Sequence, residues 1–206
     1  MKKIRLLIAD DHAIVRMGLK SLIAMEDDLE LVGEAKNGTE SVDAAERLKP
    51  DVVVMDLMMP KMDGVAATAE IRRRMPSVQV VVLTSFAGAD AIAHALDVGA
   101  IGAVLKSAAE TELVAAVRNA AAGRECVSPE IRRQLDVDPP VPPLTDRQRD
   151  ILLSVTRGLS NSDIARELGI AEITVKNHVA ALFEKLGAAN RAEAVATALR
   201  KQLTKM

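Results

Sequence analysis

Residues 52–56 read Val-Val-Val-Met-Asp, which is four consecutive apolar residues followed by a carboxylate. Pro50 precedes this stretch and Pro60 follows it, so turn-forming residues mark both of its ends. A strand that is apolar at every position is expected where helices cover both faces of a parallel sheet. The stretch therefore predicts a central, buried strand with Asp56 at its carboxyl end.

Four other apolar runs lie at residues 4–9, 31–32, 78–83 and 103–105, and longer segments rich in Ala and Leu separate them. Alternation of short strands with helices indicates right-handed βαβ units and a parallel sheet. The fold predicted for this half is α/β, a flavodoxin-like doubly wound (βα)5 domain in which the third strand lies beside the first. Helices are expected at residues 13–24, 39–48, 65–75, 89–96 and 110–122.

Polar side chains of kinds that bind phosphate follow four of these five runs, and they are Asp10 and Asp11, Asp56, Thr84 and Lys106. Ligands of an open parallel sheet bind outside the carboxyl ends of its strands, so we expect these side chains to meet. Alone, the aspartate pair could cap a helix and Lys106 could be an ordinary surface lysine. Their joint occurrence at successive strand ends favours a shared site.

The three aspartates predict a metal site. Carboxylates close together repel one another, and a hard divalent cation with oxygen ligands removes that repulsion. We expect Mg²⁺ (or Mn²⁺) to be bound by Asp10, Asp11 and Asp56, with the backbone carbonyl of Met58 as a further ligand. Asp56 stands singly at the end of the central strand, which makes it the best candidate for a carboxylate that accepts a phosphoryl group covalently.

The other two polar residues suit the oxygens of a phosphoryl group. Phosphoryl transfer depends on neutralising the charge of those oxygens more than on covalent chemistry by side chains. Lys106 can supply a point charge, and Thr84 can donate a hydroxyl hydrogen bond. The set therefore predicts a site for phosphoryl transfer.

A linker is predicted by residues 136–143, which read Asp-Val-Asp-Pro-Pro-Val-Pro-Pro. Prolines remove amide donors and favour an extended, semi-rigid backbone. We assign residues 1–125 to a first domain, 126–143 to a Pro-rich linker and 144–206 to a second domain. Within that linker, Ser128-Pro129-Glu130 could begin a short helix that reaches Leu135.

The second domain is predicted to be all-α, with four helices that include a helix-turn-helix. Capping residues at Thr145, Ser160 and Asn190 precede helical segments, and Gly158, Gly169 and Gly187 end them. The third helix carries an apolar stripe with the period of a helix, made of Val175, Val179, Leu182 and Leu186.

The third helix of this domain is the candidate DNA reader. Lys and Asn can hydrogen-bond base edges, a small residue allows close approach, and a hydroxyl near the helix start can contact a phosphate. The candidate contacts are Thr174, Val175, Lys176, Asn177 and Ala180. From the pattern alone, a generic helical bundle with a solvated polar face is the alternative.

Charge and composition separate the two halves and place the protein. Residues 1–143 carry 17 Lys and Arg against 22 Asp and Glu, whereas residues 144–206 carry 10 against 7, so the halves are expected to have different partners. There is a single Cys, and no apolar run approaches the roughly 20 residues that span a bilayer. We expect a cytoplasmic protein with no membrane partner.

These residues resemble two known domains. Residues 1 to 125 resemble the receiver domain of bacterial two-component response regulators in Ile-Ala-Asp-Asp-His (8–12), Val-Met-Asp-Leu-Met-Met-Pro-Lys-Met-Asp-Gly (54–64), Val-Leu-Thr-Ser (82–85) and Gly-Ala-Ile-Gly-Ala-Val-Leu-Lys (99–106). Residues 144–204 resemble the LuxR-type DNA-binding domain in Leu-Thr-Asp-Arg-Gln (144–148), Gly-Leu-Ser-Asn-Ser-Asp-Ile-Ala (158–165) and Ile-Thr-Val-Lys-Asn-His-Val (173–179). Together they are similar to a response regulator of the NarL/FixJ type.

The resemblance implies a set of roles. Asp56 would be the phosphoacceptor for a sensor histidine kinase, Asp10 and Asp11 would bind Mg²⁺, and Thr84 and Lys106 would sense the phosphoryl group. The second domain would bind promoter DNA, with a homodimer forming on phosphorylation or DNA binding. Beyond its own phosphorylation and dephosphorylation, the protein would not be an enzyme.

One position departs from the family pattern. Most receiver domains carry Tyr or Phe where this chain has Ala103, and that ring swings inward as the threonine moves toward the phosphate. Ala103 has no ring, so the coupling to this switch position is open; Phe86 could supply bulk on the same face or be a core residue. A regulator that binds DNA independently of phosphorylation is therefore an alternative. A second alternative is a Mg²⁺-dependent phosphohydrolase with an aspartyl intermediate. Such enzymes usually have a second aspartate two residues after the nucleophile, and this chain has Met58 at that position.

Overall fold

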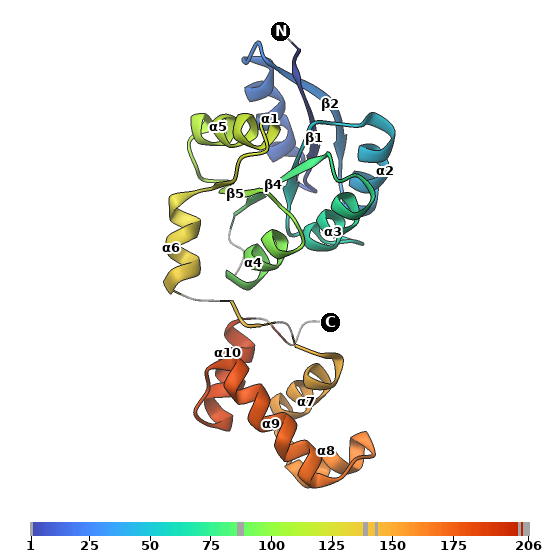
Figure 1. The fold of residues 1–206 in the computed structure, drawn as a ribbon, viewed down its shortest axis with the longest axis vertical. Helices are drawn as coiled ribbons and strands as arrows, with labels where there is room; N and C mark the ends of the chain where they lie inside the picture. Colours follow the sequence, from blue (N-terminus) through green and yellow to red (C-terminus); the bar gives the residue numbers. More distant parts are fainter. Residues whose placement is uncertain (1, 86–88, 138–139, 143, 202, 204–206) are drawn as a thin grey trace. The chain divides into compact units, whose positions relative to one another are not determined.

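The computed structural model describes residues 2–85, 89–137, 140–142, 144–201 and 203. It divides the chain into two compact units, Met1–Pro139 and Pro140–Met206 (Figure 1). Phe86 lies outside the described residues. In the described part of the chain, no helix is both long enough and apolar enough to cross a membrane.

The first unit is a six-stranded parallel sheet with the strand order β2-β1-β3-β4-β5-β6. Its strands are β1 (Ile4–Ala9), β2 (Leu29–Ala35), β3 (Val52–Asp56), β4 (Gln79–Thr84), β5 (Gly102–Leu105) and β6 (Cys126–Val127). Its helices are α1 (Ala13–Ala24), α2 (Gly38–Leu48), α3 (Gly64–Arg74), α4 (Ala89–Asp97), α5 (Glu110–Ala121) and α6 (Pro129–Val137). The predicted doubly wound α/β fold, with β3 beside β1, is confirmed.

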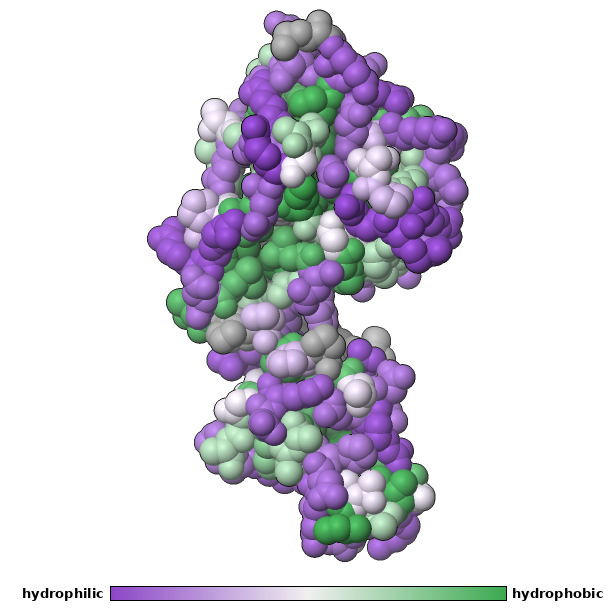
Figure 2. All heavy atoms as spheres, in the orientation of Figure 1, coloured by the Kyte–Doolittle hydropathy of each residue, from purple (hydrophilic) through white to green (hydrophobic). Residues whose placement is uncertain are grey.

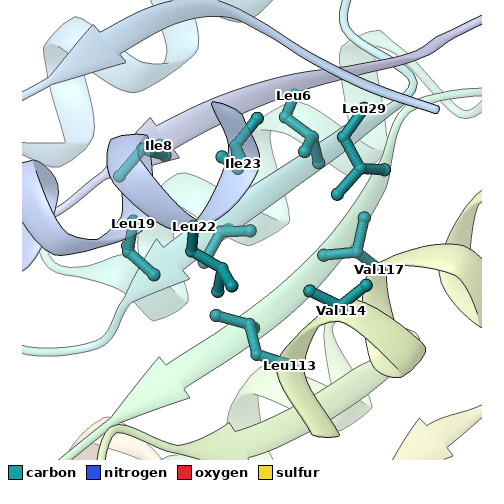
Figure 3. Close-up of a pocket in the computed structure, with 10 residues that line it drawn as sticks. Leu6, Ile8, Leu19, Leu22, Ile23, Leu29, Leu113, Val114 and Val117 are labelled. Carbon is teal, nitrogen blue, oxygen red and sulfur yellow. The ribbon is translucent and has the colours of Figure 1, made fainter. Parts of the chain in front are cut away.

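Helices cover both faces of the sheet, as the wholly apolar β3 predicts. Val52 and Val54 pack with α1 and α5, whereas Val53 and Met55 pack with α2 and α3 on the other face. Figure 3 shows side chains of α1 and α5 converging with Leu6, Ile8 and Leu29 of the sheet around a small cavity. The lining of this cavity is entirely apolar, so it belongs to the core.

The second strand is longer than its apolar run predicts. β2 spans Leu29–Ala35 instead of residues 31–32 and lies at the edge of the sheet. Glu30 and Glu34 are exposed within it, because one side of an edge strand faces solvent. A search for uninterrupted apolar runs misses such a strand.

Residues 126–137, predicted to be part of a linker, form β6 and α6 and lie within the first compact unit, which extends to Pro139 instead of ending at residue 125. β6 pairs with β5, and Ile131 of α6 is completely buried in a cluster with Val82, Ile92 and Ala103. α6 packs on the sheet because it is amphipathic, with Ile131 and Leu135 on one helical face. The Ser128 hydroxyl supports the start of the helix by accepting a hydrogen bond from the Ile131 amide. Only the alternative of a short helix after Ser128 anticipated this arrangement.

The surface of the first unit is mostly polar. On the face that Figure 2 draws, hydrophobic side chains gather around α4 and α6. A separate groove is lined by Glu112, Ala115 and Asn119 of α5 and by Cys126 and Pro129 at the start of α6.

The second unit is all-α, as predicted. Its helices are α7 (Asp146–Thr156), α8 (Asn161–Leu168), α9 (Glu172–Leu186) and α10 (Arg191–Arg200). Thr145 and Ser160 form capping boxes, and Gly169 and Gly187 adopt the left-handed conformation that ends a helix. Apolar residues from all four helices share one core.

Candidate functional site

The predicted phosphate-binding residues gather at the carboxyl edge of the first unit's sheet. Asp10 directly follows β1, Asp56 ends β3, Thr84 ends β4 and Lys106 directly follows β5. The strands β1, β3, β4 and β5 are adjacent and parallel, so their carboxyl ends lie at the same edge of the sheet. Residues that are far apart in the sequence therefore become neighbours there.

Lys106 joins two buried carboxylates. Its Nζ lies 2.6 Å from Asp10 Oδ2 and 2.7 Å from Asp56 Oδ2. Asp10 is 1% exposed and Asp56 is 3% exposed, so water neutralises little of their charge. The structure thus brings these three residues together as expected.

Burial and charge shift the protonation of this pair. Burial raises the pKa of Asp56 above its usual value, and the charge of Asp10 adds to this, although the Lys106 ammonium partly opposes it. Burial also acts to lower the pKa of Lys106, but hydrogen bonds to Asp10 and Asp56 outweigh it, so the net shift is upward. Lys106 is therefore a fixed positive charge at neutral pH.

Asp11 and His12 complete an acidic cluster. Ligand atoms of Asp10, Asp11, His12 and Asp56 all lie within 4.8 Å of one another. One ammonium cannot balance three carboxylates, and their oxygens are ligands that Mg²⁺ prefers. The donor set present therefore fits the predicted divalent cation.

The loop after β3 is held closely against Asp56. The Met58 amide donates a 3.3 Å hydrogen bond to Asp56 Oδ1, and the Gly64 amide donates to the Leu57 carbonyl at 2.9 Å. A Cβ at Gly64 would lie 2.0 Å from the Asp56 carbonyl oxygen, so only glycine fits here without moving the backbone. Met58 exposes its side chain, and its carbonyl stays a predicted ligand.

Thr84 and Ala103 occupy the neighbouring strands. Thr84 is 1% exposed, and its carbonyl accepts a 2.8 Å hydrogen bond from the Lys106 amide. Ala103 is completely buried, pairs with Val127 of β6 and belongs to the cluster that contains Ile131. Thus β6 and α6 cover the position at which the sequence lacks an aromatic ring.

Two residues near the site escaped the sequence prediction. His12 contacts both aspartates. Its Nδ1 lies 2.8 Å from Asp11 Oδ1, and its backbone amide donates a 2.7 Å hydrogen bond to Asp10 Oδ1. Arg16 is buried on α1, where it donates to the Asp10 carbonyl at 2.8 Å and lies 3.4 Å from Glu34. Adjacency to Asp11 was a signal for His12, whereas nothing in the helical pattern marks Arg16.

The helix-turn-helix of the second unit consists of α8, the turn 169–171 and α9. Lys176, Asn177 and Ala180 are exposed on α9, and Thr174 is half-buried near its start. Val175 is completely buried in the core, so the prediction that it contacts DNA is wrong. The period of the apolar stripe already placed Val175 on the inner face.

Comparison with known proteins agrees with both units. Residues 6–118 match the response regulator receiver domain, and residues 142–198 match the LuxR family of bacterial regulatory proteins. The response regulator VraR of Staphylococcus epidermidis is 37% identical over 205 residues, covering 97% of this chain and 98% of the relative. VraR of Staphylococcus aureus matches with the same identity and coverage.

Solved structures match over nearly the whole chain. ChrA, the response regulator of a heme-sensing two-component system, is 35% identical with a TM-score of 0.59, covering 98% of this chain and all of that one. RcsB from Salmonella enterica serovar Typhimurium, bound to a promoter in the presence of the phosphomimetic BeF3⁻, is 26% identical with a TM-score of 0.72, covering 95% and 98% of the two chains. This chain belongs to the two-component response regulators that regulate transcription through a receiver domain joined to a LuxR-type DNA-binding domain.

Proposed function

We propose that Asp56 accepts a phosphoryl group from a sensor histidine kinase in the cytoplasm, and that this modification controls promoter binding by the second unit. The observation that carries the proposal is Lys106, whose ammonium contacts two buried carboxylates at the carboxyl edge of the sheet. Such a cation stands beside the oxygens of a group attached to Asp56, where phosphoryl transfer needs positive charge.

Asp56 Oδ1 is the oxygen better prepared to attack phosphorus. Oδ2 accepts a 2.7 Å hydrogen bond from Lys106, whereas Oδ1 accepts, among the described residues, the longer 3.3 Å bond from the Met58 amide. In the transfer, Oδ1 forms the new bond to phosphorus while the phosphorus–nitrogen bond of the kinase's phosphohistidine breaks. Lys106 holds its charge beside the transferred oxygens, and the Thr84 hydroxyl donates to one of them.

Mg²⁺, or Mn²⁺, is proposed to bind Asp10, Asp11 and Asp56, with the Met58 carbonyl as a further ligand. When bound, the cation supplies positive charge to the carboxylates and to the phosphoryl oxygens. The presence of three carboxylates beside a single ammonium supports this assignment.

Phosphorylation with a small phosphodonor and Mg²⁺ tests the acceptor, and intact-mass spectrometry reads the product. Wild type is expected to gain one phosphoryl group, and Asp56→Asn none. Asp43→Asn is the matched control, because Asp43 is exposed on α2 and is not part of the carboxylate cluster around Asp56. Full labelling of Asp56→Asn would refute the assignment.

The output surface is proposed to be α9, with Thr174, Lys176, Asn177 and Ala180 facing DNA. The protein would bind as a homodimer when phosphorylated or on DNA. A two-fold dimer places two reader helices about 34 Å apart, which matches half-sites one turn apart.

We infer that α6 takes part in the coupling that the missing ring leaves open. Ala103 lies on β5 next to the strand that carries Thr84, and the Ser128 amide before α6 donates to the Ala103 carbonyl at 2.9 Å. A shift of β4 and β5 on phosphorylation would therefore reach α6 directly. The alternative is binding independent of phosphorylation, and DNA affinity measured with and without beryllofluoride at fixed salt decides between them, since equal affinities would favour independence.

A further inference from the structure

The reader helix α9 carries an exposed isoleucine that its fold does not use. Ile173 exposes 65% of its surface, whereas the neighbouring Val175 is completely buried. A β-branched residue in an exposed helical position is less favourable for the helix than alanine, and the exposed part of its side chain gains no burial in return. Its presence at this point is therefore not explained by the stability of the second unit.

The position of Ile173 places it within the predicted DNA-facing surface. Lys176, Asn177 and Ala180 follow it by three, four and seven residues, a spacing that puts all four side chains on one helical face. The core residues of α9, from Val175 to Leu186, lie on the opposite face. Recognition helices contact base edges through their N-terminal residues, and Ile173 is the second residue of α9.

Major-groove chemistry identifies the partner of an exposed aliphatic group. Base edges there present hydrogen-bond donors and acceptors, which suit Lys176 and Asn177, and one apolar group, the 5-methyl of thymine. We propose that Ile173 is a specificity-determining residue that packs against a thymine methyl in each half-site. This inference rests on DNA binding by the second unit and adds a base preference that its polar residues cannot supply.

The geometry of α9 also limits where that thymine lies. Ile173 and Asn177 are one turn apart, about 6 Å along the helix axis. The thymine is therefore expected within two or three base pairs of the base that Asn177 contacts.

The test begins with selection of binding sites from random duplexes by the full chain with beryllofluoride and Mg²⁺. Each thymine of the selected site is then replaced singly by deoxyuridine, which lacks only the methyl group. For wild type, deoxyuridine at one position of each half-site is expected to raise the Kd for that duplex about fourfold, which is the effect of losing the burial of one methyl group. For Ile173→Ala, the same replacement is expected to leave Kd unchanged, while binding to unrelated DNA stays equal to that of wild type.

Two variants separate this role from folding and from general hydrophobicity. Ile173→Val keeps a β-branched side chain and is expected to keep part of the deoxyuridine effect. Leu199→Ala removes another exposed aliphatic side chain, on α10 (61% exposed), and should behave as wild type. Circular dichroism melting should show Ile173→Ala to be folded, because its side chain is exposed.

The outcomes distinguish the inference from the function on which it rests. If wild type selects no consensus site, sequence-specific DNA binding itself fails. If wild type selects a site but deoxyuridine affects wild type and Ile173→Ala equally at every position, the thymine contact is wrong. A loss of transcription by Ile173→Ala with unchanged DNA affinity would instead assign Ile173 to a protein partner and would also overturn the proposal.

Discussion

The docking of α6 on the receiver sheet predicts a large cost for Ile131→Ala. Ile131 is 0% exposed, and the substitution removes three carbons, each worth about 0.8 kcal/mol of burial. The cavity left among Val82, Ile92 and Ala103 adds to this, so the free energy of unfolding of the first unit should fall by about 3–4 kcal/mol. Such a loss lowers its melting temperature by roughly 10 °C.

Urea unfolding followed by far-ultraviolet circular dichroism measures this change, because the chain has no Trp or Tyr to report by fluorescence. Hydrogen exchange of peptides from α6 shows whether the helix detaches before the sheet unfolds. Val137→Ala is the matched control on the same helix, since Val137 is 86% exposed and should change stability by less than about 0.5 kcal/mol. Equal, small effects of both variants, with rapid exchange throughout α6, would refute the docking.

Three further predictions concern the site and its surroundings. Lys106→Met should cost about 3 kcal/mol near neutral pH, because it leaves two buried carboxylates without their cation. The ammonium opposes the upward shift that burial gives the pKa of Asp56, so its removal raises that pKa further. The cost should therefore shrink as pH falls through the folded-state pKa of Asp56, as urea titrations at several pH values will show. Gly64→Ala should slow phosphorylation by about tenfold or more, because the added Cβ would displace the backbone of the phosphoacceptor Asp56. Gly18→Ala is the control, because a Cβ there meets nothing within 4 Å. Phosphorylation of the two variants at equal rates, followed by mass spectrometry, would contradict the reasoning. Ala103→Phe should destabilise the first unit by about 1–3 kcal/mol, because the larger side chain overpacks the cluster that contains Ile131. In the double variant with Ile131→Ala this cost should fall, since the smaller side chain leaves room for the ring. If urea unfolding shows that the two changes in free energy simply add, the two side chains do not share space.

Much of the fold and site was predictable because the relevant signals are local. The apolar run at residues 52–55 requires two covered faces, and a parallel sheet places the ends of its strands together. Asp10, Asp56 and Lys106 could therefore be assigned to one place before any distance was known.

The parts that were missed depend on tertiary context. Glu30 and Glu34 interrupt the apolar pattern of β2, because only an edge strand tolerates them. Cys126–Val127 is too short to be recognised as a strand until β5 lies beside it. Likewise, Arg16 reaches the Asp10 carbonyl through a fold that its own helix does not specify.

β6 also protects the edge of the sheet against aggregation by strand pairing between copies of the chain. A bare strand edge offers unpaired amides and carbonyls to another copy of the chain. Here β6 shields β5 with only two residues, and Pro129 follows almost at once, so there is little left to template a further strand. A receiver fragment cut after residue 125 would bare the β5 edge together with the apolar surface under Ile131. Such a fragment is expected to aggregate at concentrations at which a fragment that ends at residue 139 stays soluble.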